Sequence, residues 1–192
     1  RDVEAMAAEN ATPGDYACFL GAGSYRHYVP AIVRQLAGRS EFMTAYTPYQ
    51  PEVAQGTLQA HYEFQSMVCQ LTGMDVANAG MYDGSTSLAE AALMAARTTK
   101  RSRIALLDTV SPALRRVIET YTQAPGLDIY SVSSDNIDLS DDTACLIVQQ
   151  PGFLGQMEDV EALSKQTHAS GALLVVSADP MSLGMFKPPA EY

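Results

Sequence analysis

The stretch RIALLDTVSPALRRVIETYTQAPGLDIYSV, residues 103–132, decides the fold of this chain. Its two ends, 103–107 and 127–132, are short apolar segments with the length and composition of buried strands. Between them, Ser111 followed by Pro112 is a typical helix start, and helical spacing continues through Tyr121. A strand, a helix and a second strand in this order predict one βαβ unit with parallel strands and a right-handed crossover.

The same alternation continues downstream. Residues 144–149 (ACLIVQ) predict a third strand, residues 157–169 a helix, and residues 172–178 (ALLVVSA) a fourth strand. Continuous apolar runs of this kind are typical of strands that are buried on both faces of a parallel sheet. The sequence therefore predicts an α/β fold with three layers, in which helices cover both faces of the sheet.

Two helices are expected upstream of the sheet. Residues 51–72 predict one that begins at Pro51 and ends before Gly73, where a left-handed C-terminal cap is expected. Its apolar residues recur every three or four positions: Leu58, Tyr62, Phe64, Val68 and Leu71. Ser87 and Glu90 fit a capping box at the start of an alanine-rich segment, which predicts a central helix with close neighbours. Residues 1–50 read as an irregular segment with one short helix at 29–37, and residues 51–192 as the folded α/β part.

Composition narrows the function classes. Of the 192 residues, 47% are hydrophobic and only 18% are charged, so the chain can build a large core but has little charge to cover it, which suggests a partner. The net charge of −10 repels phosphate backbones and anionic lipids, which argues against nucleic-acid and membrane binding. No apolar run reaches the length of a membrane span. The chain opens at Arg1 and closes on a proline-rich stretch, so we expect a piece of a longer protein.

The cysteines and histidines indicate neither a disulfide framework nor a metal site. Cys18, Cys69 and Cys145 are far apart and form no CxxC pair, which favours a reducing, cytoplasmic location. The three histidines do not have metal-ligand spacing, and a structural or surface role is expected for each: His27, His61 and His168.

Three places at the ends of predicted elements could bind a ligand, because open parallel sheets bind ligands beyond the carboxyl ends of their strands. The first is Asp83-Gly84-Ser85-Thr86-Ser87, where N–H groups and hydroxyls at a helix N-terminus could cradle a phosphate. A plain capped turn is the alternative. The second is Asp179, whose carboxylate could pair with a cationic ring nitrogen or simply belong to a turn before Pro180. The third is Gln149-Gln150-Pro151-Gly152, which also fits a structured loop.

The lysines are poorly placed for a Schiff base. Lys100 and Lys165 fall near helix ends or faces, and Lys187 follows Asp179 too closely to return to the same cleft. No serine or cysteine nucleophile has an adjacent base. A tyrosine-rich loop that includes Tyr25, Tyr46 and Tyr49 suits either a cleft wall or an interface.

Several motifs resemble the glycine cleavage system P-protein family, the glycine decarboxylases. They are FLGAGSY (19–25), EFMTAYTPYQPE (41–52), QGTLQ (55–59) and LTGMDVANA (71–79), and the continuation MYDGSTSLAEA (81–91) resembles the first, alpha, subunit of the split bacterial form. The resemblance covers nearly all of this chain but only the middle of a subunit more than twice as long. It supports the expectation of a fragment.

The resemblance implies part of the large domain of a fold type I pyridoxal phosphate-dependent transferase, truncated at its C-terminus. It also implies an alpha2-beta2 assembly that decarboxylates glycine and passes the aminomethyl group to the lipoyl arm of the H-protein. In that family the Schiff-base lysine belongs to the beta subunit, so no catalytic residue is expected here. Carried over by position, Asp83, Gly84, Ser85 and Thr86 match the phosphate-loop region, and Asp179 matches the aspartate that faces the pyridine nitrogen. In a subunit without the lysine, these five residues can be vestigial.

Two alternatives stay open from the sequence. One is a self-sufficient pyridoxal phosphate enzyme of the aminotransferase or desulfurase type, with its lysine beyond residue 192. The other is a non-catalytic phosphate- or nucleotide-binding α/β module that uses the segment 83–87. The second lacks both a GxGxxG after a strand and a P-loop lysine.

Overall fold

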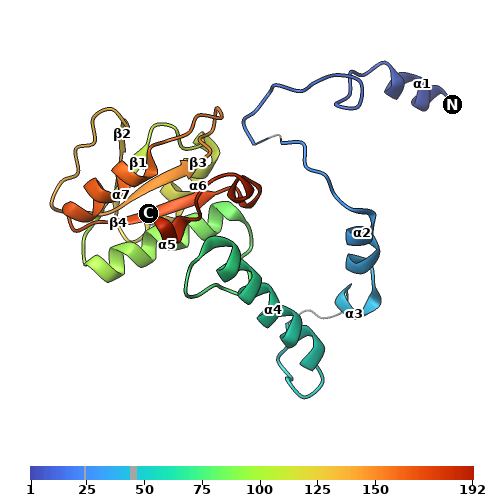
Figure 1. Ribbon diagram of the computed structural model, residues 1–192, viewed down its shortest axis with the longest axis horizontal. Helices are drawn as coiled ribbons and strands as arrows, with labels where there is room; N and C mark the ends of the chain where they lie inside the picture. Colours follow the sequence, from blue (N-terminus) through green and yellow to red (C-terminus); the bar gives the residue numbers. More distant parts are fainter. Residues whose placement is uncertain (24, 44–46) are drawn as a thin grey trace.

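The centre of the molecule is a four-stranded parallel sheet. In the computed structural model, which describes residues 1–23, 25–43 and 47–192, the sheet has the strand order β2-β1-β3-β4 (Figure 1). The strands are β1 (Arg103–Leu107), β2 (Asp128–Val132), β3 (Thr143–Gln150) and β4 (Leu173–Ala178). All three pairings are parallel, as the sequence predicts.

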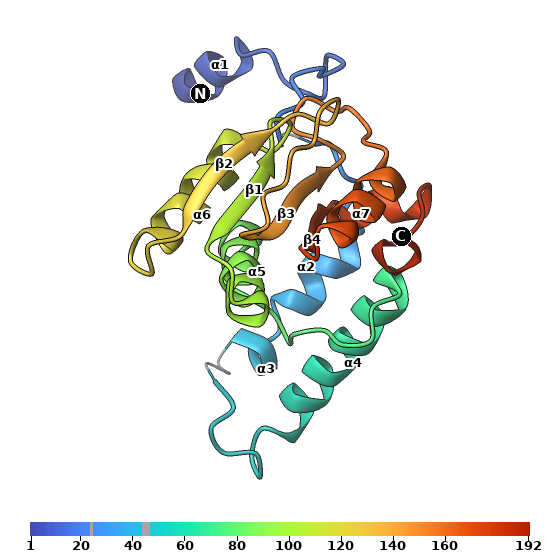
Figure 2. The ribbon, with the colours of Figure 1, turned by 90° about the vertical axis from the view of Figure 1, so that its left-hand side faces the viewer.

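The direction of the crossovers places the helices on both faces. Helix α6 (Pro112–Gln123) leads from β1 to β2 at one edge, and α7 (Val160–Ala169) leads from β3 to β4 at the other. Two right-handed crossovers that move in opposite directions put their helices on opposite faces. Helix α5 (Gly84–Thr99) packs beside α6 and against β3 and β4, so α5 and α6 form one layer and α7 the other (Figure 2). The three-layer α/β prediction is confirmed.

The core lies between β3 and helix α5. From Thr143 to Val148 every residue of β3 is buried, because this strand has a neighbour on each side and helices on both faces. On α5, the buried residues that face it are mostly alanines: Leu88, Ala89, Ala92, Ala95 and Ala96. Small side chains let the helix axis approach the sheet closely, which is why an alanine-rich sequence forms this central helix.

The start of α5 differs from the predicted capping box. The N-cap is Asp83, not Ser87: the Asp83 carboxylate accepts from the Thr86 N–H at 2.7 Å, and the Thr86 hydroxyl lies 3.2 Å from the Asp83 N–H. Helix α5 therefore begins at Gly84, earlier than a Ser87 cap would allow. Asp and Ser cap about equally well, and the alanine pattern alone does not choose between them.

Upstream of α5, helix α4 (Gln55–Thr72) ends as predicted at Gly73, whose φ of 72° is left-handed. The predicted start at Pro51 is wrong, because residues 51–53 form a turn and the helix begins at Gln55. None of the residues of α4, all of which lie in the described range 47–192, is buried.

The segment before α4 extends away from the sheet (Figure 1). It holds α1 (Asp2–Ala8), α2 (Ala31–Ala37) and α3 (Ser40–Met43), of which the sequence predicted only α2. Almost all of its described side chains are exposed. We call residues 1–54 the arm.

The carboxyl end of the chain returns to α7 and α4. After β4 come two short 3-10 helices, η1 (Pro180–Gly184) and η2 (Pro189–Glu191). Residue Ala190 of η2 lies against Gly73, so closely that a Cβ added at Gly73 would be 2.8 Å from the Ala190 Cβ. Helix α7 begins at Val160 and not at Met157, because Asp159 caps it by accepting from the Ala162 N–H.

We predict that Asp83→Ala lowers the melting temperature by about 2–4 °C, because α5 loses its N-terminal hydrogen bonds. Asp83→Asn is the matched control: its amide oxygen accepts the same N–H, and the melting temperature should stay close to that of the wild type. Equal losses in both variants, measured by circular dichroism, would contradict a capping role.

The buried thiol of Cys145 gives a second prediction. Burial raises its pKa to about 12, so the folded protein keeps the thiol neutral while the unfolded chain ionises it above roughly pH 8.5. The stability from this group is therefore complete below that pH and falls as pH rises towards 12, with a slope of at most about 1.4 kcal/mol per pH unit. Urea unfolding at a series of pH values should show a steeper loss for the wild type than for Cys145→Ala, and parallel curves would contradict it.

Candidate functional site

The segment 83–87 forms a capped turn that uses most of its own hydrogen-bonding groups. The Asp83 carboxylate binds the Ser85 hydroxyl at 2.6 Å as well as the Thr86 N–H, and the Ser87 hydroxyl binds the Asp83 carbonyl. The hydrogen bond from Ser85, followed by that from the Thr86 N–H, lowers the pKa of Asp83. A carboxylate thus already occupies the anion position at this helix N-terminus.

The Asp179 side chain is also hydrogen-bonded to the neighbouring backbone. It lies at the end of β4, half-buried, and its carboxylate accepts from the Met181 N–H at 3.0 Å as the N-cap of η1. The backbone of Asp179 donates to the Gln150 carbonyl, which ties the ends of β3 and β4 together. This geometry is that of the turn interpretation that the sequence left open.

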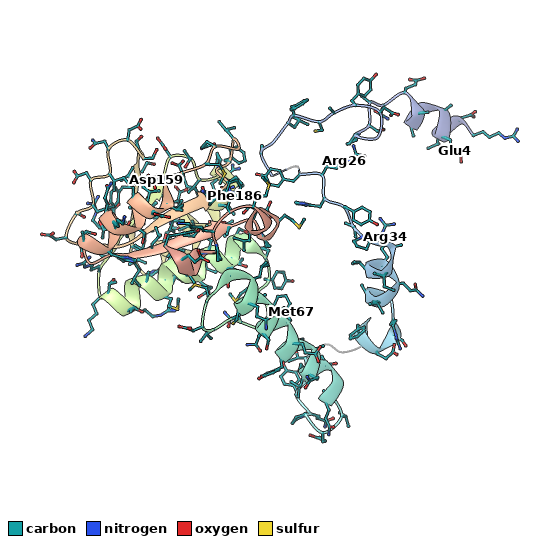
Figure 3. The ribbon with its side chains drawn as sticks, viewed as in Figure 1. Glu4, Arg26, Arg34, Met67, Asp159 and Phe186 are labelled. Atoms are coloured by element: carbon teal, nitrogen blue, oxygen red, sulfur yellow. The ribbon has the colours of Figure 1, made fainter. Side chains whose placement is uncertain are left out.

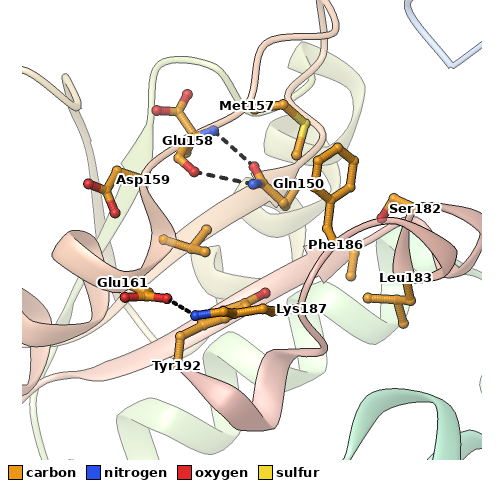
Figure 4. Close-up of a pocket in the computed structure, with 12 residues that line it drawn as sticks. Gln150, Met157, Glu158, Asp159, Glu161, Ser182, Leu183, Phe186, Lys187 and Tyr192 are labelled. Carbon is orange, nitrogen blue, oxygen red and sulfur yellow. Dashed lines mark hydrogen bonds and ion pairs between the residues drawn. The ribbon is translucent and has the colours of Figure 1, made fainter.

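The two glutamines at the end of β3 hold neighbouring loops. Gln149 accepts from the Ser111 N–H at 2.8 Å, at the start of α6. The buried amide of Gln150 donates to the Glu158 carbonyl at 3.2 Å and accepts from the Glu158 N–H at 3.1 Å (Figure 4). Both side chains are engaged with the backbone, as in the structured-loop interpretation.

A cavity of about 250 Å³ opens at the carboxyl ends of β3 and β4, between α7 and η1. Apolar side chains, among them Met157, Val160 and Phe186, make up part of its wall. Lys187 and Glu161 form an ion pair across it with an Nζ–Oε1 distance of 2.5 Å (Figure 4). Glu158 and Asp159 add negative charge, so the cavity joins an apolar wall to an acidic rim with one cation.

The lysines remain unsuited to covalent chemistry. The hydrogen bond to Glu161, and then the charge of that carboxylate, raise the pKa of Lys187, which keeps its amine protonated. Lys100 is the exposed C-cap of α5, and Lys165 is exposed on α7. A Schiff-base lysine needs a free amine at the site, and none of these three environments favours one.

The tyrosine-rich loop lies on the arm. Tyr25 is 42% exposed and contacts the His27 ring edge-on, with the ring centroids 6.2 Å apart, and Tyr49 is 80% exposed. Tyr46 lies outside the described residues. Arg26, in the same loop, donates to the Pro13 carbonyl, and Figure 3 shows it on the arm.

Two buried oxygens at the carboxyl end of the sheet are unpaired. Among the described residues, Thr109 Oγ1 and Gln156 Oε1 are buried side-chain atoms without a hydrogen-bond partner. Thr109 follows β1 and Gln156 follows β3, and the Phe153 N–H donates to the Thr109 carbonyl between the two loops. This edge has hydrogen-bonding capacity that the described chain does not use.

No group of three or more His, Cys, Asp or Glu side chains that could hold a metal ion occurs within residues 1–23, 25–43 and 47–192. The same described residues contain no helix that is long and apolar enough to cross a membrane.

Sequence reasoning found the strand ends but missed the cavity. Of the residues that line it, the sequence points only to Gln150 and Lys187, because α7 and η1 bring the others together from separate parts of the chain. The one available signal was position: residues just after the carboxyl ends of β3 and β4 must meet at one edge of a parallel sheet.

Comparison with known proteins places the chain in a family. It is 51% identical over 97% of its length to the probable glycine dehydrogenase (decarboxylating) subunit 1 of Carboxydothermus hydrogenoformans. A solved glycine decarboxylase (P-protein) of the glycine cleavage system, in inhibitor-bound form, superposes with a TM-score of 0.86 and 42% identity over 98% of this chain. The chain spans 44% of the length of each of these two proteins.

A more distant structure shares the fold alone. The sphingosine-1-phosphate lyase of Burkholderia pseudomallei is 17% identical, with a TM-score of 0.54 over 68% of this chain and 35% of that protein. The architecture is that of the fold type I pyridoxal phosphate enzymes. The family model described as glycine cleavage system P-protein matches residues 1–192, so the chain belongs to the P-protein family.

Proposed function

We propose that this chain is part of subunit 1, the alpha subunit, of a two-subunit glycine dehydrogenase (decarboxylating). With a beta subunit, in an alpha2-beta2 assembly, it would decarboxylate glycine and transfer the aminomethyl group to the lipoyl arm of the H-protein, in the cytoplasm. The observation that carries this proposal is the 51% identity to a protein named as subunit 1, over 97% of this chain. Residues 51–192 would then be part of the large domain, with residues 1–50 as its N-terminal extension.

The partner subunit, and not this chain, would hold the cofactor. Glycine decarboxylation needs an electron sink, which pyridoxal phosphate supplies when bound. The residues expected to hold it here fit it poorly. The Asp83 carboxylate already occupies the N-terminus of α5, where it would repel a phosphate, and the Asp179 carboxylate is turned to its own backbone. The Asp83–Thr86 turn and Asp179 would therefore stabilise the fold of this subunit.

What remains for this subunit is to shape the shared active site. An active site that excludes water needs walls that a partner can supply. Exposed tyrosines pack well at such surfaces because one end is apolar and the hydroxyl can donate a hydrogen bond. Tyr25 and Tyr49, with Tyr46 between them in the sequence, would supply part of this wall or of the alpha–beta interface.

The assignment of the cofactor to the partner can be tested in the assembled two-subunit enzyme. After loading with pyridoxal phosphate and reduction with borohydride, peptide mapping should place the adduct on a lysine of the beta subunit and leave this chain unmodified. Stoichiometric labelling at Lys187 would overturn the proposal, because this chain would then carry its own Schiff base.

The variant Asp179→Asn provides an independent prediction. The amide oxygen of the new side chain still caps η1, so we expect cofactor absorbance to be unchanged and the rate of glycine-dependent bicarbonate exchange to stay within about threefold of the wild type. A carboxylate that stabilises a charged transition state contributes about a hundredfold or more. A loss of that size, at unchanged melting temperature, would show that Asp179 contacts the cofactor.

A further inference from the structure

Helix α4 carries an apolar stripe that the described chain leaves about half exposed. Ala60, Phe64, Met67 and Leu71 follow one another at spacings of four, three and four, which puts them on one side of the helix. Phe64 is 44% exposed, Met67 60% and Leu71 45%. We call these four residues the α4 stripe.

The rest of α4 also lacks the charged side chains that are typical of a solvent-exposed helix. Among its 18 residues, Glu63 is the only one with a formal charge at neutral pH. Five of its polar side chains lie together on a different side: Gln55, Gln59, Glu63, Ser66 and Gln70. A helix with one polar side and one uncharged apolar side is amphipathic, and its apolar side is normally packed against other protein.

The apolar surface continues into the arm. A groove lies between the α2–α3 segment and the start of α4, with Leu36, Phe42 and Val53 in its wall. On α2, Ile32, Val33 and Leu36 are each about half exposed. The α4 stripe and the arm therefore leave far more apolar surface in water than isolated exposed residues would.

The total exposed area supports the same conclusion. The chain exposes 13169 Å². A compact monomer of this mass exposes about 8,900 Å². The excess, about 4,000 Å², shows that the arm and α4 do not pack with the sheet into one compact body.

The extended course of the arm is shared with a longer P-protein. The TM-score of 0.86 covers 98% of this chain, so the superposition includes the arm and α4 as well as the sheet. That chain is more than twice as long, because this chain covers only 44% of it. The arm and α4 thus keep this extended arrangement where more protein is present to cover them.

We propose that the α4 stripe docks directly onto the beta subunit. The inference rests on the proposed function, which supplies a partner subunit. Coverage by the described sheet is disfavoured because the arm and α4 lead away from it (Figure 1). The contacts that the described body makes with α4 include η1 and, at the C-terminal end of the helix, Ala190 against Gly73. The lack of charge in the stripe fits an apolar surface on the partner.

Cross-linking in the assembled enzyme identifies the occupant. A photoreactive benzophenone amino acid at position 67 should cross-link to a peptide of the beta subunit, while the same group at position 66, on the polar side, should not. Cross-links from position 67 to the rest of the same subunit, or to a second copy of it, would overturn the inference. In either case, an enzyme that still decarboxylates glycine leaves the proposed function standing.

Two variants that each add one charge measure the strength of the contact between the α4 stripe and the beta subunit. Met67→Lys and Ser66→Lys both add one positive charge next to Glu63, so their effects on the isolated helix should be similar. We expect Met67→Lys to weaken the association of the two subunits at least tenfold in sedimentation experiments, and Ser66→Lys to change it less than twofold. Hydrogen exchange in α4 checks that both variants are folded. Equal affinities for the two folded variants would overturn the inference.

Discussion

The rest of the structure depends on the complete burial of the central strand β3. It lies between β1 and β4 with a helix layer on each face, and its residues from Thr143 to Val148 are all buried. A strand in that position can carry only uncharged side chains, and all of its backbone N–H and C=O groups must be hydrogen-bonded. The alanines of α5 follow from the same constraint, because larger side chains there would push the helix away from β3 and β4.

The need to satisfy backbone groups also explains the state of the candidate ligand sites. Parallel strands end and their helices begin at one edge of the sheet, where the first N–H groups of each helix lack partners within the helix. In this chain Asp83, Asp159 and Asp179 cap α5, α7 and η1, and Gln150 binds the backbone of Glu158. Side chains that a catalytic relative could direct at a ligand are here directed at the chain itself. This use of the side chains supports the proposal that the partner subunit holds the cofactor.

The arm and α4 show the opposite balance. They have regular helices and apolar stripes but few contacts with the sheet. Their apolar side chains are therefore exposed, whereas those of the core are buried. Free energy from apolar burial is gained only when a second surface meets the first. Burial of these segments in an assembly would agree with the proposal that this chain is part of a larger enzyme.

The sequence by itself determined the four strands and, to within a few residues, helices α2, α4, α5, α6 and α7, and with them the parallel α/β class, because these depend on local spacing. It also determined the family, because the family is carried by short sequence motifs. It also named Asp83 and Asp179 as residues at element ends. Only the tertiary structure decided which cap each one makes, that Asp83 and not Ser87 starts α5, and that Lys187 pairs with Glu161. It alone showed that the α4 stripe is about half exposed. The reason is that periodicity fixes which residues share a face, whereas partners such as Glu161 and Lys187, 26 residues apart, meet only after the intervening strand has joined the sheet.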